Sequence, residues 1–348
     1  MRASKYAYGI VRVRAKRAFM LKPEDYEALI RAPNIYQALA HLRSVSDFGR
    51  DVPQTEDMYE IEKHLANRFV EVLRTLIESV KDEVAKAFLE RAFTKYEYET
   101  LKALLKAKFL GVPEGEAVLM TPPLGRYSGA LYSSLLSAKN ADEAIDLVPE
   151  AELKPILKEA LREAETLKNP LPMEVAVDKW FYTQLWGLTD ALKGDDKKWA
   201  KHLLGTEIDM KNILVLVRGK ILGLQPSVIE KGWLPLRYKL SLDFKGLVSQ
   251  PLSSILQAIA TSYYGKAVSP LIRGAVEVER ALEALWVKEN EDVFLHYPFT
   301  LGLVYAYGNL KYVELKDVRA LLFSKLMNLP PQRTLALITR HREKLSFR

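Results

Sequence analysis

The chain has 348 residues, no cysteine and a hydrophobic content of 49%, and its formal net charge at pH 7 is +7. This length and apolar content allow one sizeable buried core or several smaller ones, and the lack of cysteine excludes disulfides, thiolate nucleophiles and cysteine-ligated zinc. The longest apolar runs fall well short of the roughly 20 residues that a membrane span requires, and no signal-peptide pattern is present. We therefore expect a cytoplasmic protein.

The positive charge is concentrated at the start of the chain. Residues 1–22 contain no acid and seven basic residues, which equal the whole net charge: Arg2, Lys5, Arg12, Arg14, Lys16, Arg17 and Lys22. A nucleic-acid-binding protein more often carries a basic stripe with interleaved aromatic residues on its folded body. Because the excess charge here lies in one segment instead, nucleic-acid binding is kept only as an alternative. Within this segment, the alternation over residues 11–15 is compatible with a short strand.

Helical patterns dominate from residue 23 onward. Pro23 followed by two acidic residues predicts one helix start, and Asn34 and Asn140 predict two more, because asparagine caps the free N–H groups of a helix N-terminus. Apolar residues then recur every four positions, as at Leu65 and Phe69, which is typical of a buried helix face. The sequence therefore predicts an all-α fold.

Three segments share one residue pattern. Each begins at an acid and continues with a branched aliphatic residue four positions later, a lysine at eleven, and a glycine or asparagine at fourteen. The acids, lysines and terminal residues are Glu97, Asp209, Glu314, Lys108, Lys220, Lys325, Gly111, Gly223 and Asn328. A pattern that recurs after ~110 residues indicates bundle-sized repeats and not a short-repeat solenoid. We place the repeats at residues 1–118, 119–228 and 229–348.

Elementary helix chemistry explains these positions. Thr94 and Thr206 precede their acids by three residues, as in a capping box, and acid and lysine then complement the helix dipole in the first and last turns. Glycine and asparagine tolerate the left-handed conformation just past a helix end. The pattern thus predicts three helices of about 14 residues, each about 21 Å long. In the third copy Lys311 replaces the threonine, which suggests that this helix extends upstream through Tyr305.

Motifs for catalysis or ligand binding are missing from the sequence. Gly265-Lys266 lacks the remaining residues of a P-loop, and no G-x-G-x-x-G occurs. The five histidines form neither an i,i+4 pair nor an HExxH motif, and the loop at residues 125–129 has the wrong glycine spacing for a nucleophile elbow. We therefore expect no catalytic site, no cofactor and no metal. An enzyme whose site converges from ordinary acids and arginines, and a helical scaffold, are further alternatives.

The repeated segments resemble the C subunit of the archaeal and bacterial rotary ATPases, whose eukaryotic relative is the d subunit of the vacuolar ATPase. The resemblance covers essentially the whole chain. It rests on residues 6–15 (YAYGIVRVRA), on 207–213 (EIDMKNI) followed by RGK at 218–220, and on 305–311 (YAYGNLK) with Glu314, Asp317 and Arg319. Asp317 stands where the family often has asparagine, so the hydrogen bonds at that position are expected to differ.

The resemblance implies three similar helical lobes that form a funnel around a pseudo-threefold axis. The narrow cap of such a funnel sits on the cytoplasmic surface of the membrane proteolipid ring, and its open mouth receives the central stalk of subunits D and F. The implied function is non-catalytic: the chain transmits torque between stalk and ring, coupling ion transport to ATP synthesis or hydrolysis. It would be a peripheral protein at the cytoplasmic face of the cell membrane, and no homo-oligomer is expected.

The candidate partner-binding residues are all basic: Arg12, Arg14, Lys16, Arg17, Arg218 and Arg319. Those of the N-terminal segment can contact acidic groups of a rotor partner or lipid headgroups. They can equally form a solvated helix face that pairs with acids of another helix. The main alternative to a rotor subunit, a basic helical nucleic-acid-binding protein, would bind its ligand with a steep salt dependence.

Overall fold

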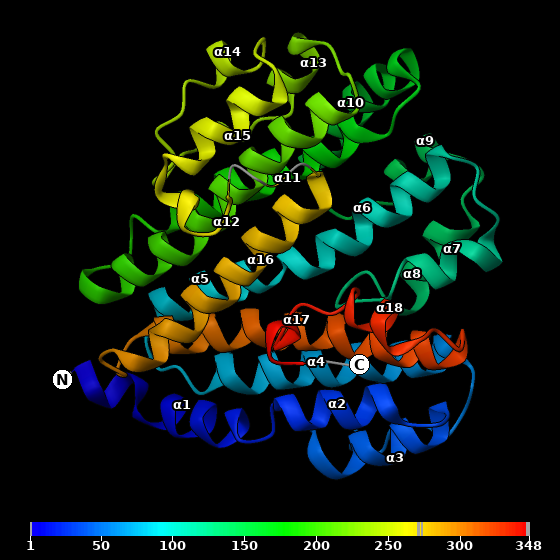
Figure 1. The fold of residues 1–348 in the computed structure, drawn as a ribbon, viewed down its shortest axis with the longest axis vertical. Coiled ribbons are helices and arrows are strands. Elements are labelled where there is room, and N and C mark those ends of the chain that lie inside the picture. The colour runs from blue at the N-terminus through cyan, green and yellow to red at the C-terminus, as the bar shows by residue number, and fades with distance from the viewer. Residues whose placement is uncertain (1, 270–271, 273, 346–348) are drawn as a thin grey trace. The chain divides into compact units, whose positions relative to one another are not determined.

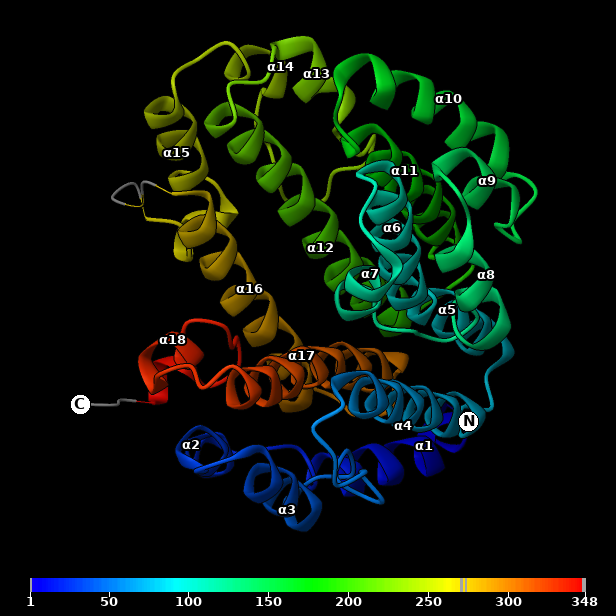
Figure 2. The same ribbon diagram turned by 90° about the vertical axis from the view of Figure 1, so that its right-hand side faces the viewer.

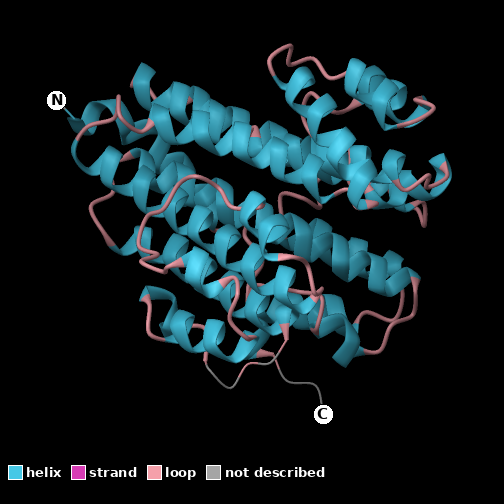
Figure 3. Ribbon diagram, turned by 90° about the horizontal axis from the view of Figure 1, so that it is seen from above, coloured by secondary structure: helices cyan, strands magenta, loops and turns pink. Residues whose placement is uncertain are grey.

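The computed structural model describes residues 2–269, 272 and 274–345, and every regular element in these ranges is a helix (Figures 1 and 3). The predicted all-α class is therefore confirmed. The chain divides into two compact units: unit 1 comprises Met1–Leu147 and Tyr297–Arg348, and unit 2 comprises Val148–His296. Unit 1 is discontinuous in sequence, because the last helices of the chain pack against the first.

Unit 1 contains the N-terminal and C-terminal helices. They are α1 (Arg2–Arg17), α2 (Pro23–Arg31), α3 (Ile35–Val45), α4 (Met58–Glu78), α5 (Glu83–Phe93), α6 (Lys95–Phe109), α7 (Glu114–Met120), α8 (Gly129–Ser137), α9 (Ala141–Asp146), α17 (Leu301–Leu326), α18 (Pro331–Leu335) and the 3₁₀ turn η3 (Arg342–Lys344). Asn34 and Asn140 cap α3 and α9 through their side-chain oxygens, and α2 begins at Pro23. These three predicted helix starts are confirmed.

Helix α17 forms the centre of unit 1. All ten residues from Leu301 to Leu310 are buried, and the helix packs against α4, α1, α3 and α5. Figure 1 shows α17 running alongside α4. A helix that is apolar around its whole circumference is stable only inside a bundle. Gly308 permits one of the closest contacts, because a Cβ at this position would lie 2.3 Å from the ring of Phe93.

Unit 2 is built around α12, its longest helix. Its elements are α10 (Leu153–Leu167), α11 (Leu171–Leu188), α12 (Gly194–Ile221), α13 (Pro226–Lys231), α14 (Phe244–Leu247), α15 (Leu252–Ala260), η1 (Tyr263–Lys266), α16 (Ala275–Asp292) and η2 (Val293–Leu295). Helix α12 packs against α16, α15, α13 and α11, and α10 packs against α11. Figure 2 shows both the α12–α16 pair and the α10–α11 pair.

The N-terminal segment is helical, so the expectation of a strand over residues 11–15 is wrong. Tyr6, Ile10 and Val13, spaced four and three residues apart, are the buried positions of α1. A spacing of three and four is the helical period, and the short alternation between basic and apolar residues was coincidental.

The predicted start of the second helix in the repeat pattern, at Thr206, is also wrong. Helix α12 has 28 residues and α17 has 26, so Thr206 and Glu314 lie inside their helices, whereas α6 has 15 residues. The upstream extension of α17 through Tyr305 is confirmed. Thr94 does precede α6, but its hydroxyl donates to the carbonyl of Arg91 and makes no capping box. The helices continue upstream because buried apolar residues such as Leu203 follow the same helical period.

Candidate functional site

The helices that carry the repeated pattern, α6, α12 and α17, are called the repeat helices below, and all three end in the same way. Gly111, Gly223 and Asn328 follow them with φ of +66°, +65° and +48°. In each case the next backbone N–H bonds to the carbonyl five residues earlier: Val112 to Ala107 (3.0 Å), Leu224 to Gly219 (2.9 Å) and Leu329 to Ser324 (2.9 Å). This hydrogen-bond pattern is a Schellman motif. The left-handed helix ends predicted from the pattern are therefore confirmed.

The lysine of each repeat helix caps a second helix. Lys220 donates to the carbonyl of Val248, directly after α14, over 3.1 Å. Lys108 and Lys325 donate to backbone carbonyls in the last turns of α8 and α2, those of Leu136 and Ile30. Carbonyls at a helix C-terminus have no partner within the helix and attract cations. The sequence revealed the position of the lysines in their own helices but not this second contact.

The order of these contacts along the chain is cyclic. Lys108 and Lys220 each reach a helix 28 residues further on, whereas Lys325 reaches back 295 residues to α2. Helices α8 and α14 follow the first and second repeat helices, and α2 precedes the first. The first two repeat helices thus each hold a helix that follows them in the chain, and the last one holds a helix near its beginning.

A second repeated position lies three residues after each acid. Thr100 donates to the carbonyl of Pro122 over 2.7 Å. Asn212 accepts from the N–H of Leu234 over 2.8 Å, and its amide donates to the carbonyls of Leu234 and Leu236. In both cases the segment that follows the repeat helix is hydrogen-bonded back to that helix, through a residue 22 positions further along the chain.

Asp317 occupies the same position in α17 and makes a different set of bonds. Its carboxylate accepts from the N–H groups of Thr339 (2.7 Å) and Arg340 (2.9 Å) and from the Tyr26 hydroxyl (2.9 Å). A carboxylate can only accept, so the chain presents N–H groups here and not the mixture of N–H and C=O that faces Asn212. Burial raises the pKa of Asp317 to about 6, although these three hydrogen bonds oppose the rise.

The acids that define the pattern have diverged in role. Glu97 pairs with Arg126 over 2.9 Å in a partly exposed contact. Asp209 is fully buried and accepts from the N–H groups of Tyr238 and Lys239 and from the hydroxyl of Tyr264, at 2.7–2.9 Å. Burial raises the pKa of Asp209, and the two N–H groups and the hydroxyl oppose it. Only Glu97 lies in a first turn as predicted.

Glu314 belongs to a buried group of charges within unit 1. Lys311, whose side chain is fully buried, contacts the carboxylate of Asp47 and lies 3.1 Å from Glu314. Arg340 lies 3.5 Å from the other oxygen of Glu314. Two positive and two negative charges thus compensate one another, as buried charges require. They join α17 to the end of α3 and to the C-terminal segment.

A second polar group in unit 2 surrounds Glu289, on α16. His202 approaches one carboxylate oxygen at 2.7 Å, the Tyr263 hydroxyl donates to the other over 2.9 Å, and Lys266 also contacts it. Burial alone would raise the pKa of Glu289, but the hydrogen bonds from His202, Lys266 and Tyr263 outweigh it and lower that pKa to about 2. The group ties η1 and α12 to α16.

The predicted partner-binding residues of α1 lie at or near the surface. Arg14 and Arg17 are exposed. Arg12 stacks over the ring of Tyr8 at 4.7 Å and donates weakly to the carbonyl of Thr75 at 3.4 Å. Lys16 lies 3.9 Å from Asp47, and burial lowers its pKa. Three guanidinium groups are therefore displayed by one helix.

Arg218 and Arg319 each have an intramolecular partner. Arg218, on α12, pairs with Glu279 of α16 at 2.5 Å, and both side chains are partly exposed. Arg319, on α17, bonds through Nε and Nη2 to a single oxygen of Glu62 on α4, at 3.0 and 2.8 Å. The Glu62 side chain is only 6% exposed, so this pair holds two helices of the core together.

Sequence reasoning missed a repeated surface feature at the ends of the repeat helices. Leu110, Leu222 and Met327, each directly before the left-handed residue, are 55%, 68% and 54% exposed. Exposed large apolar residues at equivalent repeat positions indicate contact sites, because one isolated apolar residue on a surface is ordinary but three equivalent ones are not. The signal was present in the sequence as an apolar residue before each glycine or asparagine.

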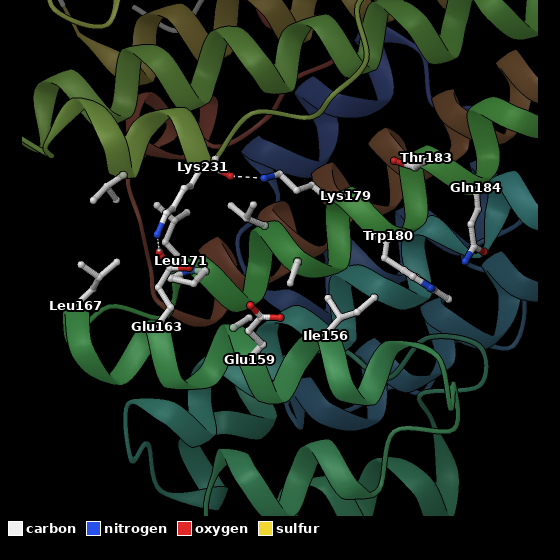
Figure 4. A pocket seen from close by; sticks show the side chains of 16 residues that line it. Ile156, Glu159, Glu163, Leu167, Leu171, Lys179, Trp180, Thr183, Gln184 and Lys231 are labelled. Carbon is white, nitrogen blue, oxygen red and sulfur yellow. Dashed lines mark hydrogen bonds and ion pairs between the residues drawn. The ribbon is translucent and has the colours of Figure 1, made fainter. Parts of the chain in front are cut away.

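A groove of about 530 Å³ lies within unit 2, between α10, α11 and α13 (Figure 4). Trp180 and aliphatic residues line it, whereas the neighbouring Phe181 and Tyr182 are core residues. At its rim Lys231 pairs with Glu163 at 2.7 Å, and Lys179 contacts the carbonyl of Lys231. Burial lowers the pKa of Lys179. Lys231 thus connects Glu163 and Lys179 at the rim of the groove.

Two further features concern ligands and membranes. Across the described ranges, histidine, aspartate and glutamate form no group of three or more that could hold a metal ion. Within the same ranges, no helix combines the length and the apolar character needed to cross a bilayer.

Comparison with known proteins identifies relatives along nearly the entire chain. The C subunits of A-type ATP synthases are 24% identical in Methanocaldococcus jannaschii, over 96% of this chain and 86% of the relative, and 24% identical in Haloferax volcanii, over 93% and 94%. The protein of the same name from Pyrococcus horikoshii is 21% identical over 90% of this chain and 85% of its own length. The family model of ATP synthase (C/AC39) subunits matches residues 10–337. The chain therefore belongs to the family of ATP synthase (C/AC39) subunits.

Proposed function

We propose that this chain is a non-catalytic rotor subunit of an A-type ATP synthase, which links the central stalk of subunits D and F to the membrane proteolipid ring. The observation that carries the proposal is the family match over residues 10–337. A linking subunit needs surfaces for partners and no chemistry of its own, and the polar groups described above serve to join helices.

The proposal includes three helical repeats, over residues 1–118, 119–228 and 229–348, related by pseudo-threefold symmetry in a funnel. The cyclic order of the lysine contacts supports it. Lys108 and Lys220 bond to the ends of α8 and α14, which lie in the second and third proposed repeats, and Lys325 bonds to the end of α2 in the first. The proposed position is peripheral, at the cytoplasmic face of the membrane, and the absence of a long apolar helix from the described residues agrees with it.

The repeated apolar residues at the ends of the repeat helices are the proposed contact sites for rotor partners. Leu110, Leu222 and Met327 are displayed without being needed for the core. Apolar side chains at the centre of an interface contribute most of its affinity when they become fully buried. Partner contact at equivalent points of three repeats suits a subunit that must transmit torque without slipping.

The test is co-purification of the tagged chain with the D and F subunits and the proteolipid ring of its source organism, at moderate salt. We expect stable complexes with both partners. Leu222→Ser and Leu110→Ser should weaken binding at least tenfold, whereas Leu295→Ser, at a residue 81% exposed outside the pattern, should not. Charge reversal by Arg12→Glu with Arg14→Glu should weaken docking as well. A chain that binds neither partner but binds nucleic acid with a steep salt dependence would overturn the proposal.

A further inference from the structure

Helix α1 has two apolar faces, and only one of them is used by the fold. Tyr6, Ile10 and Val13 are at most 5% exposed and pack toward α17 and α4. On the other side, Tyr8 and Val11 are 55% and 67% exposed. A surface helix of a globular protein normally presents polar residues to water on this side. The second apolar face therefore requires an explanation outside the unit.

The exposed apolar residues form a continuous stripe. Tyr8, Val11 and Ala15 follow one another at spacings of three and four, so they share one face of the helix, and the exposed Phe19 (56%) extends the stripe four residues further, just past the helix end. At 100° per residue, Arg12 lies on one side of this stripe and Arg14 on the other. The stripe is thus flanked by guanidinium groups on both sides.

The ionisable side chains of the segment that carries the stripe, residues 1–22, are all basic or tyrosine, with no acid among them. Two of the basic residues have acidic neighbours from other helices, since Lys5 pairs with Asp82 at 2.6 Å and Lys16 lies 3.9 Å from Asp47. Arg14 is exposed beside the C-terminal half of the stripe. The occupant of the stripe must therefore combine an apolar layer with negative charge.

We propose that α1 is an interfacial anchor, which lays its exposed stripe on an anionic phospholipid bilayer. Tyr8, Val11 and Phe19 enter the boundary between headgroups and acyl chains, and Arg12 and Arg14 contact the phosphates. An apolar face with flanking Lys and Arg residues is what binds a helix in the plane of a membrane surface. The cation–π contact of Arg12 with Tyr8 places charge and aromatic ring side by side, as at the headgroup level of a bilayer.

The bilayer is favoured over an acidic protein surface by the shape and rigidity of this face. The stripe is one residue wide on a convex helix, which suits shallow insertion into a soft, flat layer. The opposite side of α1 is fixed to the core: the N–H of Lys81 bonds to the carbonyl of Lys5, and Gly9 lies against Ser79. The helix therefore presents the stripe without having to fold on the membrane first.

The first experiment is co-flotation of the full chain with vesicles. Binding is expected to phosphatidylglycerol–phosphatidylcholine vesicles (1:1) at 50 mM salt, to fall steeply by 300 mM salt, and to be at least tenfold weaker with pure phosphatidylcholine. Arg12→Gln with Arg14→Gln should weaken binding roughly 25-fold, about fivefold per charge. Arg162→Gln with Lys245→Gln removes the same charge from exposed sites in unit 2 and should have no such effect.

The second experiment reports on insertion directly. Because the chain has no cysteine, Val11→Cys can be labelled at a single site with an environment-sensitive fluorophore, and its emission should shift to the blue on anionic vesicles. The same label at Val276→Cys, which is 58% exposed on α16, should not respond. Val11→Ser with Phe19→Ser should weaken vesicle binding at least tenfold while leaving thermal unfolding unchanged, since both side chains are already in water.

Three results would overturn the inference: no binding to anionic vesicles, equal binding to neutral ones, or unchanged binding after Arg12→Gln with Arg14→Gln. Capture by the acidic surface of a purified rotor partner through α1, with no vesicle binding, would assign the stripe to a protein contact instead. The inference does not rest on the proposed function. A chain that floats with vesicles but fails to join stalk or ring subunits would retain the anchor and lose the rotor proposal.

Discussion

Lys325, in the last turn of α17, donates a hydrogen bond to the backbone carbonyl of Ile30, which lies 295 residues earlier in the chain. The acceptor belongs to the last turn of α2, where carbonyls lack partners within their own helix. The long aliphatic stem of lysine suits this bond, because it crosses the packed helices and delivers a charge only at its end. Burial lowers the pKa of the Lys325 ammonium group. The hydrogen bond to Ile30 therefore also offsets the cost of removing this charge from water.

Replacing this ammonium group should destabilise the fold. Lys325→Met keeps the stem and leaves a carbonyl of Ile30 unsatisfied, which costs about 1–3 kcal/mol. Lys220→Met should cost a similar amount through Val248. Urea unfolding followed by circular dichroism measures both, with Lys288→Met, at an exposed position of α16, as the control. Changes below about 0.5 kcal/mol, the range of ordinary surface substitutions, would show that the contact is incidental.

Asp317 should make stability fall as the pH rises from about 4 to about 6. The pKa of Asp317 is about 6 in the folded chain and about 3.9 in an unfolded one, so the folded state binds more protons between these values and loses stability as they leave. The loss is about 2–3 kcal/mol. Asp317→Asn should flatten this part of the pH profile, as measured by urea unfolding at half-unit steps.

The same substitution should cost stability at low pH. An asparagine amide keeps one acceptor oxygen but replaces the other with an NH2 group, which then faces the N–H of either Thr339 or Arg340 and cannot accept from it. Below pH 4 Asp317→Asn should therefore be less stable than the native chain by about 1–3 kcal/mol. Parallel pH profiles for the two proteins would contradict the first expectation, and equal stability below pH 4 would contradict the second.

Glu289 should give stability a pH dependence of the opposite sign to that of Asp317. Its pKa is lowered to about 2 in the folded chain, below the ordinary value of about 4.3, so its stabilising contribution is complete above pH 4.3 and is lost as the pH falls toward 2. Glu289→Gln should cost about 1–3 kcal/mol at pH 7, and this difference should shrink between pH 4 and pH 3. A difference that stays constant from pH 7 to pH 3 would argue for a purely steric effect.

The left-handed ends of the repeat helices can be tested by glycine-to-alanine substitutions, each of which adds a single methyl group. A Cβ at Gly111 or Gly223 would meet no atom within 4 Å, so alanine there adds only the backbone strain of a positive φ, about 1–2 kcal/mol. Gly187→Ala, in the last turn of α11 and equally free of contacts, should instead stabilise, by at most about 1 kcal/mol. Thermal unfolding should place the two substitutions on opposite sides of the native chain.

The C-terminal halves of the repeat helices were predictable from sequence because local chemistry determines them. Gly111, Gly223 and Asn328 end their helices whatever surrounds them, since few other residues accept a left-handed backbone. The N-terminal half of α12 was not, because the length of this helix depends on tertiary burial, which overrides a local capping signal such as Thr206. Helix α1 was missed for a different reason. The short alternation of basic and apolar residues concealed the helical spacing of the buried Tyr6, Ile10 and Val13.

The candidate site was predictable only where residues act locally. Sequence reasoning found the basic residues of α1 but could not see that Arg319 would be bound by Glu62, 257 residues away. It placed the acids as helix caps, whereas the buried Asp209 collects N–H groups from a later segment. Pairings over such distances depend on how the helices are arranged in space. One-dimensional spacing carries no information about them.

The discontinuity of unit 1 also sets an order of assembly during translation. Unit 2 is a contiguous stretch, Val148–His296, and leaves the ribosome complete before α17 has been made. At roughly 5–20 residues per second, α2 waits on the order of 15–60 seconds for the lysine that caps it. The N-terminal helices must stay soluble for that time without their central helix. A nascent chain stalled before residue 301 should therefore be the species that chaperones bind, and release of the final 50 or so residues should end that dependence.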